Sequence, residues 1–236
     1  MNSTPQRTAL ITGASRGLGL ALARRLAAEG WSLLITGRGA PALEAARAEL
    51  AQQTQVIAIT GDVDDPGHRA HLAATASEAG GLDLVVNNAS MLGPSPQPAL
   101  LDYPLDVLLD VFRINTLAPL AVLQAVRGAL KPEARVINIS SDAAVEAYPG
   151  WGGYGASKAA LEQITAILAA ENPGLLVYGV DPGDMRTQMH QEAFPGEDIS
   201  DRPLPEESLP GLIELITGDY PSGRYAARAL VSEVHS

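Results

Sequence analysis

Residues 8–30, TALITGASRGLGLALARRLAAEG, contain the clearest structural signal of the chain. An apolar, β-favouring run at 8–12 passes through a glycine-rich turn into a helix rich in alanine and leucine. Gly13, Gly17 and Gly19 give the spacing G-x-x-x-G-x-G. Glycines let the backbone approach a pyrophosphate closely, and a helix N-terminus offers free N–H groups and the positive end of its dipole. A strand followed directly by this turn and a helix predicts a dinucleotide-binding loop.

The same alternation of strand and helix continues along the chain. Further continuous apolar runs predict strands at 32–36, 55–60, 83–88, 135–140, 175–180 and 223–230. Helices are expected at 17–29, 41–52, 66–79, 103–130 and 152–171. Pro119 should kink or divide the fourth helix. Strands that are apolar throughout belong to a sheet covered on both faces. We therefore predict an α/β fold, a single doubly wound Rossmann-type domain over 1–236 with a seven-stranded, mostly parallel sheet and helices on both faces.

Residues 184–210, DMRTQMHQEAFPGEDISDRPLPEESLP, interrupt this alternation. The segment is polar, contains four prolines and is too long for a simple connector. Such a segment is either a disordered insertion or a lid over a site. Ligands of this fold bind beyond the C-terminal ends of the strands, and the segment follows such an end directly. Its position favours a substrate lid.

Composition and charge restrict the partners of the chain. It has 236 residues, a formal net charge of -11 and no cysteine. An acidic surface repels nucleic acid and anionic membranes, so neither is expected as a partner. The absence of thiols excludes disulfides and thiolate chemistry. The N-terminus has no basic segment followed by an apolar one, and no apolar run is long enough to span a bilayer, which predicts a cytoplasmic protein.

Metal and hydrolase sites are not supported by the sequence. The four histidines show no arrangement typical of metal ligands, so no metal is expected; they are His68, His71, His190 and His235. His68 and His71 lie three apart on a polar helix and are expected to be solvated. Ser141 lies in no G-x-S-x-G elbow.

The segment WGGYGASKAALEQI, residues 151–164, places Tyr154 and Lys158 on one helical face among small residues. A free phenol has a pKa of about 10, which is too high for a general base at neutral pH. A nearby ammonium, like the positive charge of a nicotinamide, favours the phenolate and lowers that pKa. Alone, such a pair is more often an exposed helical pair without a function. Ser141, thirteen residues before Tyr154, and the glycine loop together favour proton transfer by Tyr154.

The motifs along the chain resemble, in order, those of the short-chain dehydrogenase/reductase family. They are TGASRGLG at 12–19, NNAS at 87–90, Asn115 in RINTLAP, Ser141 in NISS, YGASK at 154–158 and DPGDMRT at 181–187. The resemblance runs from about residue 8 to about residue 230. It implies a catalytic group of Asn115, Ser141, Tyr154 and Lys158. In it Tyr154 exchanges a proton with the carbonyl oxygen, Ser141 binds that oxygen, Lys158 binds the nicotinamide ribose, and Asn115 holds a water connected to Lys158.

The glycine loop and the resemblance together assign the contacts of a nicotinamide dinucleotide. These contacts are Gly13, Ser15, Arg16, Gly17, Leu18, Gly19, Arg38, Asp62, Val63, Asn88, Ala89, Tyr154, Lys158, Pro182, Gly183, Met185 and Thr187. NAD-preferring relatives carry an acidic residue at the end of the second strand, whereas this strand ends in TGRG. Arg38 and Arg16 would flank a 2′-phosphate, which predicts NADPH rather than NADH. The alternative is that Arg16 and Arg38 are ordinary surface residues with no role in cofactor binding.

Four features depart from the family pattern. Ser90 replaces the usual glycine of N-N-A-G and adds a hydroxyl near the cofactor, and Asp181 replaces the commoner asparagine before Pro-Gly. The C-terminal segment 223–236 lacks the Gly-Gly ending of many relatives, which often contributes to tetramer contacts. The segment 184–210 matches no particular substrate class.

The sequence thus predicts an NADPH-dependent oxidoreductase acting on a CH–OH group, which reduces a ketone or aldehyde to an alcohol. A non-catalytic dinucleotide-binding sensor or scaffold is the alternative. An apolar or aromatic small-molecule substrate would contact Met91, Leu92, Tyr148, Trp151, Met189 and Phe194. Alanine- and leucine-rich faces on the fourth and fifth helices are typical of a homodimer or homotetramer, and they also suit burial within one subunit.

Overall fold

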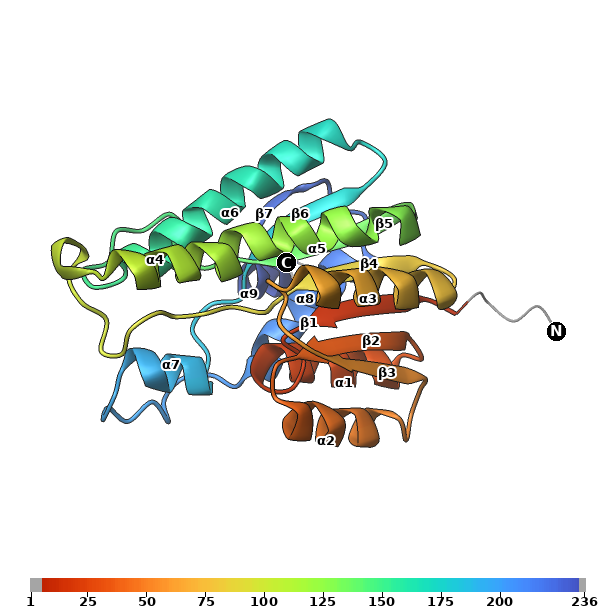
Figure 1. Ribbon diagram of the computed structural model, residues 1–236, viewed down its shortest axis with the longest axis horizontal. Coiled ribbons are helices and arrows are strands. Elements are labelled where there is room, and N and C mark those ends of the chain that lie inside the picture. The colour runs from red at the N-terminus through yellow and green to blue at the C-terminus, as the bar shows by residue number, and fades with distance from the viewer. Residues whose placement is uncertain (1–5, 234–236) are drawn as a thin grey trace.

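The computed structural model describes residues 6–233 of the chain (Figure 1). Within these residues, seven strands form one sheet in the order β3-β2-β1-β4-β5-β6-β7, and every neighbouring pair is parallel. The strands are β1 (Thr8–Thr12), β2 (Ser32–Gly37), β3 (Val56–Thr60), β4 (Leu82–Asn87), β5 (Leu130–Ile139), β6 (Leu176–Asp181) and β7 (Gly223–Ala226). This arrangement confirms the predicted fold.

Helices cover both faces of the sheet (Figure 1). One apolar core lies between the sheet and α1 (Gly17–Ala28), α2 (Ala40–Leu50), α8 (Leu209–Thr217) and α9 (Ala227–Glu233). The second core lies between the opposite face and α3 (Pro66–Glu78), α5 (Ala118–Val126) and α6 (Gly152–Glu171). All five residues of β1 are buried, because this strand is central and contacts both cores.

The predicted fourth helix is divided, as expected. It consists of α4 (Leu105–Phe112), a π-helical turn (Arg113–Leu117) and α5. Pro119 has no N–H, so the α-helical hydrogen bond to the carbonyl of Asn115, four residues earlier, cannot form. The wider turn before the proline accommodates this loss, and it contains the predicted catalytic asparagine.

Two strand predictions need correction. The seventh strand was expected over 223–230, but β7 ends at Ala226 and the remainder forms α9, whose Ala227 and Leu230 are buried in the first core. Ala227 and Leu230 are three residues apart, which is a helical spacing. The fifth strand begins five residues earlier than expected, at Leu130, and its first part passes through Pro132. Proline suppresses a strand prediction although it is tolerated where the strand is irregular, as β4 and β5 are here.

The segment 184–210 contains α7 (Gln188–Ala193) and a 3-10 turn (Pro205–Ser208). Figure 1 shows α7 apart from the two helical layers, at the end of the molecule where α6 begins. Ile199 of this segment is buried. No helix of the described residues has the length and apolar character needed to cross a membrane.

Candidate active site

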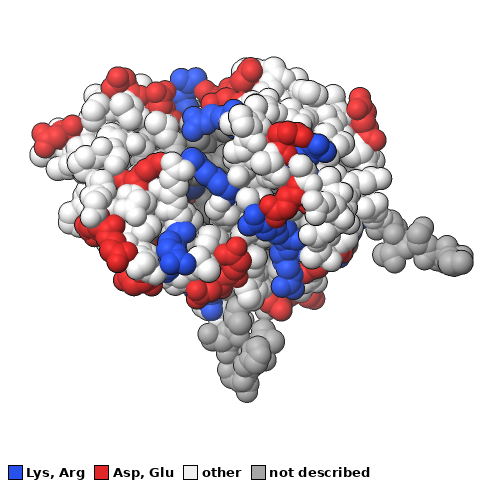
Figure 2. Space-filling model, turned by 90° about the horizontal axis from the view of Figure 1, so that it is seen from below, with Lys and Arg blue, Asp and Glu red and all other residues white. Residues whose placement is uncertain are grey.

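A cleft of about 1070 Å³ lies beyond the C-terminal ends of the strands. Residues that follow β1 to β6 line it, together with α7 and its flanks. Figure 2 shows Lys and Arg side chains gathered along a hollow on one face of the molecule, with Asp and Glu side chains around it. Every predicted site residue lines the cleft except Gly19 and Asn115. The cleft has the volume needed for a dinucleotide and a small substrate.

The glycine loop has a backbone that only glycine adopts easily. Gly13 and Gly17 have φ values of +66° and +57°. The Asn88 side-chain amide donates to the carbonyls of Thr12 at 2.9 Å and Gly13 at 3.0 Å, which fixes the loop to the end of β4. A Cβ on Gly19 would lie 2.5 Å from the Gly13 carbonyl oxygen. Gly19 is therefore a packing glycine, which explains why it does not line the cleft.

The loop fits the pyrophosphate of a dinucleotide. A Cβ on Gly17 would meet only Thr187 Cγ2, at 3.7 Å, so space is open beside the backbone at this position of the loop. Helix α1 begins at Gly17, and its N-cap residue, Arg16, makes no side-chain capping bond. The first N–H groups of α1 are thus available to an anion.

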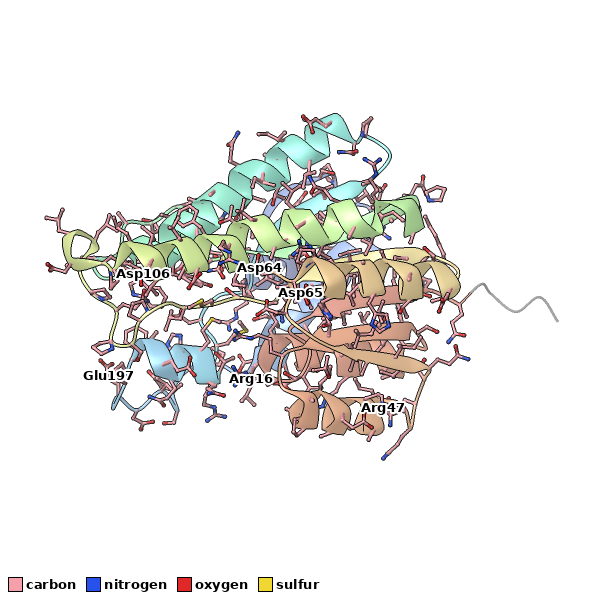
Figure 3. All side chains as sticks on the ribbon, in the orientation of Figure 1. Arg16, Arg47, Asp64, Asp65, Asp106 and Glu197 are labelled. Atoms are coloured by element: carbon pink, nitrogen blue, oxygen red, sulfur yellow. The ribbon has the colours of Figure 1, made fainter. Side chains whose placement is uncertain are left out.

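Two arginines, Arg16 and Arg38, line the part of the cleft that follows β1 and β2. The Arg38 side chain is largely exposed, and its guanidinium lies 3.9 Å from the Asp62 carboxylate. The Arg16 guanidinium donates to the Gln188 side-chain oxygen on α7. Figure 3 shows Arg16 between α7 and the helices α1 and α2. Arg16 therefore connects the glycine loop to segment 184–210, a contact that sequence reasoning missed because the two lie 172 positions apart.

The predicted catalytic side chains meet where β5 ends and α6 begins. Tyr154 and Lys158 are buried, and Lys158 Nζ lies 5.5 Å from the centroid of the Tyr154 ring. The Lys158 ammonium donates to the Ile139 carbonyl at 2.7 Å. Ser141 and Ser90 line the same cleft as the Tyr154 phenol. A proton donor, a hydrogen-bond donor and a cation thus share one wall of the cleft.

Burial decides the protonation of this pair. It raises the pKa of Tyr154 to about 12, a shift that the Asp181 and Asp142 carboxylates increase and the Ser90 and Ser141 hydroxyls oppose. Burial also lowers the pKa of Lys158 to about 8. The expectation of a lowered pKa for Tyr154 is wrong for the protein's own groups, because desolvation of the phenolate outweighs the attraction of the nearby ammonium.

Asn115 is completely buried, and its side chain is engaged by the protein. Its Oδ1 accepts from Met91 N at 2.7 Å and from the Ser90 hydroxyl at 3.0 Å. Its Nδ2 donates to the Met91 carbonyl at 2.8 Å and to Ser157 Oγ at 3.0 Å. The side chain thus holds α6 against the loop after β4. The role predicted for Asn115 in holding a water stays a prediction.

Aromatic side chains pack around Tyr154 in the cleft. The Trp151 ring lies edge-on to Tyr154 at 5.7 Å between centroids and contacts Phe194 of segment 184–210 at 6.0 Å. Leu92 and Met189 belong to the same apolar cluster as Tyr154, and Met91 lines the cleft beside them. These predicted substrate contacts therefore come together around the phenol.

Asp142 is a cleft residue that sequence reasoning missed. Its carboxylate accepts from the Ser141 hydroxyl at 3.0 Å and from the hydroxyl of Tyr148, a half-exposed predicted substrate contact, also at 3.0 Å. Its position directly after Ser141 was the available signal. Because Asp142 accepts the Ser141 proton, that hydroxyl must turn before it donates to a substrate oxygen.

The segment after β6 lines the cleft near the predicted catalytic side chains. Gly183 has a φ of +74°, and its N–H donates to the Asp181 carboxylate at 2.8 Å. Burial raises the pKa of Asp181. The Thr187 hydroxyl accepts from His190 N at 3.2 Å and caps α7. Pro182 and Met185 line the same wall.

The prediction for His68 is wrong. Its side chain is buried rather than solvated, and its Nε2 is hydrogen-bonded to the Thr36 hydroxyl at 2.8 Å. Burial lowers its pKa. The helix appeared polar in sequence, but its histidine occupies space left by the missing side chain of Gly61. His235 lies outside the described residues.

Comparisons with known proteins show which family this chain is similar to. The family described as short chain dehydrogenase matches residues 7–198. The 1-deoxy-11-beta-hydroxypentalenate dehydrogenase of Streptomyces exfoliatus is 36% identical over 192 residues, which cover 78% of this chain and 70% of that protein. The solved structure of an oxidoreductase from E. coli, yciK, has a TM-score of 0.88 at 27% identity and covers 97% of this chain and 100% of its own. An alcohol dehydrogenase from the archaeon Thermococcus sibiricus, complexed with 5-hydroxy-NADP, has a TM-score of 0.82 at 28% identity, with 94% and 95% covered.

Proposed function

This chain belongs to the short-chain dehydrogenase/reductase family, and we propose that it is an NADPH-dependent oxidoreductase that reduces a ketone or aldehyde to an alcohol. Family membership makes it an oxidoreductase with a nicotinamide dinucleotide cofactor and a small-molecule substrate. The observation that carries the proposal is the buried Tyr154 phenol beside Lys158, in a cleft that Ser141 also lines and whose other end is the glycine loop.

Different groups of the chain would bind and orient the cofactor. Bound NADPH supplies the hydride, and its oxidised form carries a positive charge on the nicotinamide. The glycine loop and the N-terminus of α1 would hold the pyrophosphate. Lys158, fixed by the Ile139 carbonyl, would hold the nicotinamide ribose hydroxyls.

Tyr154 is suited to act as the acid in the reductive direction. Its high pKa keeps the phenol protonated at neutral pH, so it has a proton to give to the carbonyl oxygen. Ser141 would donate a hydrogen bond to the same oxygen and hold it in line. In the reverse direction the phenolate must form, and the nearby ammonium of Lys158 would favour it.

Preference for NADPH is supported by charge at the adenosine end. Gly37 ends β2 without an acidic side chain, and the exposed Arg38 follows it. Arginine binds phosphate oxygens in a bidentate manner. The archaeal alcohol dehydrogenase that resembles this chain was solved with an NADP derivative, which points the same way.

We also propose that segment 184–210 acts as a lid and that the chain forms a homodimer or homotetramer. The lid is supported by Phe194 on Trp151 and by Gln188 on Arg16. The oligomer is supported by exposed apolar side chains on α4, the π-helical turn and α6, namely Leu105, Leu109, Leu117 and Ile167. Sedimentation of the purified chain tests the oligomer, which a purely monomeric species would refute.

Replacement of Tyr154 by phenylalanine tests the proposed function. NADPH oxidation is first screened across aldehydes, diketones, quinones and keto-esters. Tyr154→Phe should leave NADPH binding intact and lower turnover by roughly 10²–10⁴-fold, because the general acid is lost. Tyr225→Phe removes a phenol that donates to Pro221 outside the cleft and serves as the control. Unchanged turnover in Tyr154→Phe would assign the chemistry to another group, and NADPH binding without any turnover would favour the sensor or scaffold.

A further inference from the structure

The carboxylate of Asp142 is an acceptor on which three donors of the cleft wall converge. Its Oδ1 accepts from the Ser141 hydroxyl at 3.0 Å and from Ala143 N at 2.8 Å. Its Oδ2 accepts from the Tyr148 hydroxyl at 3.0 Å. All four residues line the cleft. The proton of Ser141, which the proposed reaction needs for a substrate oxygen, therefore lies on a carboxylate in this arrangement.

The cation beside Ser141 does not neutralise Asp142. The Arg224 guanidinium donates to the Ser141 carbonyl at 3.3 Å, but its charge is paired with Glu162 at 3.1 Å and with Asp181 at 3.6 Å. Asp142 thus presents to the cleft a carboxylate whose partners are a backbone N–H and two neutral hydroxyls. Such a group repels an anionic substrate and binds a substrate group that has a proton to donate.

Release of the Ser141 proton has a cost that a suitable substrate can remove. A hydroxyl bonds a carboxylate more strongly than it bonds a neutral carbonyl oxygen, because the first bond is charge-assisted. When the Ser141 hydroxyl turns to a carbonyl oxygen, Asp142 Oδ1 keeps the Ala143 N–H and loses the hydroxyl donor. The exchange becomes even only if the substrate itself supplies a new donor to Oδ1.

Resting on the proposed function, we propose that the substrate is an α-hydroxy ketone, whose hydroxyl donates to Asp142 Oδ1 while Ser141 donates to its carbonyl oxygen. Ser141 Oγ and Asp142 Oδ1 are 3.0 Å apart. The two oxygens of an α-hydroxy ketone, when they lie on the same side, are also about one hydrogen-bond length apart, so both bonds form side by side. One hydroxyl replaces another on Oδ1, and the bonds from Ala143 and Tyr148 are kept.

The reaction leaves the hydroxyl on Asp142 intact. Reduction adds a hydride from NADPH to the carbonyl carbon and the Tyr154 proton to the carbonyl oxygen, which gives a vicinal diol and NADP⁺. The rest of the substrate would pack on the Trp151 and Phe194 rings, whose centroids lie 6.0 Å apart. An aryl ketone with a hydroxyl on the neighbouring carbon is therefore the probe that fits both parts of the site.

Binding to the NADP⁺ complex tests the proposal without turnover, because that complex has no hydride to transfer. The probes are 2-hydroxyacetophenone, propiophenone, in which a methyl group replaces the hydroxyl, and 2-methoxyacetophenone, in which the hydroxyl has no proton. Calorimetry should show the hydroxy ketone bound at least about tenfold more tightly than either analogue, as for one hydrogen bond to a charged group. Asp142→Ala should abolish this preference and leave the Kd for NADP⁺ unchanged. The kcat/KM values with NADPH should follow the same order.

Glu146→Ala is the matched control, because Glu146 is an exposed acidic residue on the same connection after β5. It should retain the preference. Equal binding of the three ketones, a loss of preference in Glu146→Ala, or a preference that persists in Asp142→Ala would each overturn the proposal. If Asp142→Ala fails to fold, the three ketones still decide the question in the unmodified chain.

Failure of this proposal is distinguishable from failure of the proposed function. Preferential binding of the hydroxy ketone without its reduction by NADPH would support the contact with Asp142 and refute the proposed function alone. Reduction of other carbonyl compounds without any preference for the hydroxy ketone would refute the contact with Asp142 alone.

Discussion

Lys158 Nζ lies 5.5 Å from the centroid of the Tyr154 ring and is hydrogen-bonded to the Ile139 carbonyl at 2.7 Å. The end of β5 thus fixes the ammonium one helical turn after the tyrosine. Since both groups are buried, each resists its charged form, the phenol with a pKa of about 12 and the ammonium with a pKa of about 8. The burial of both groups therefore carries a cost to folding.

That cost predicts that Lys158→Met stabilises the folded chain at neutral pH. Burial lowers the Lys158 pKa from 10.5 to about 8, which disfavours folding by about 3 kcal/mol wherever the lysine is charged in both states. Loss of the hydrogen bond to Ile139 offsets about 1 kcal/mol of the gain. We expect the variant to gain about 2 kcal/mol at pH 7, measured by urea unfolding.

The pH dependence of this difference in stability shows whether the buried charge of Lys158 causes it. Between pH 8 and 10.5 the folded state has released the Lys158 proton while the unfolded state retains it, so wild-type stability rises with pH relative to Lys158→Met. The advantage of the variant should therefore disappear above pH 10.5. Lys131→Met, which breaks the 2.7 Å ion pair with Asp83, is the control and should show no gain. A variant less stable than wild type at pH 7 would contradict the prediction.

Arg38 should determine the cofactor preference. The unmodified chain is expected to bind NADPH at least about tenfold more tightly than NADH, a difference of about 1.4 kcal/mol. Arg38→Asp should erase or reverse this preference, because a carboxylate repels the 2′-phosphate and binds a ribose diol. Titration of each cofactor by fluorescence measures both. Arg47→Asp alters an arginine on the outer face of α2, paired with Glu44, and should leave the ratio unchanged. Equal affinities in the unmodified chain would refute the prediction.

Phe194 should affect the substrate and not the cofactor. Its ring packs on Trp151 beside Tyr154, so Phe194→Ala opens the substrate end of the cleft. We expect KM for an apolar carbonyl substrate to rise about tenfold, as for the loss of one buried aromatic contact, with an unchanged Kd for NADPH. Glu197 is an exposed residue of the same segment on the outer side of α7 (Figure 3). Glu197→Ala should alter neither the KM for the substrate nor the Kd for NADPH. A weaker NADPH affinity in Phe194→Ala would instead assign the residue to the cofactor site.

Local patterns predicted the parts of this structure that depend on local chemistry. The strands around β1 are continuous apolar runs, and the Tyr154–Lys158 spacing fixes a shared helical face. Features that depend on contacts between distant parts of the chain could not be predicted from local sequence patterns. The burial of His68 requires Gly61 opposite it, and the engagement of Asn115 requires the Met91 backbone, 24 positions away. The pKa of Tyr154 is raised, whereas the sequence predicted a lowered value, because burial of the phenol outweighs the neighbouring positive charge.

Asn88 gives the glycine loop a consequence for protein engineering. Its amide holds the Thr12 and Gly13 carbonyls, and a Cβ on Gly13 would approach that amide to 2.9 Å. Two motifs, whose contacting residues Gly13 and Asn88 are 75 positions apart, therefore form one interlocking unit. A phosphate loop from another dehydrogenase grafted onto this chain will keep its shape only if the residue at position 88 is transplanted with it.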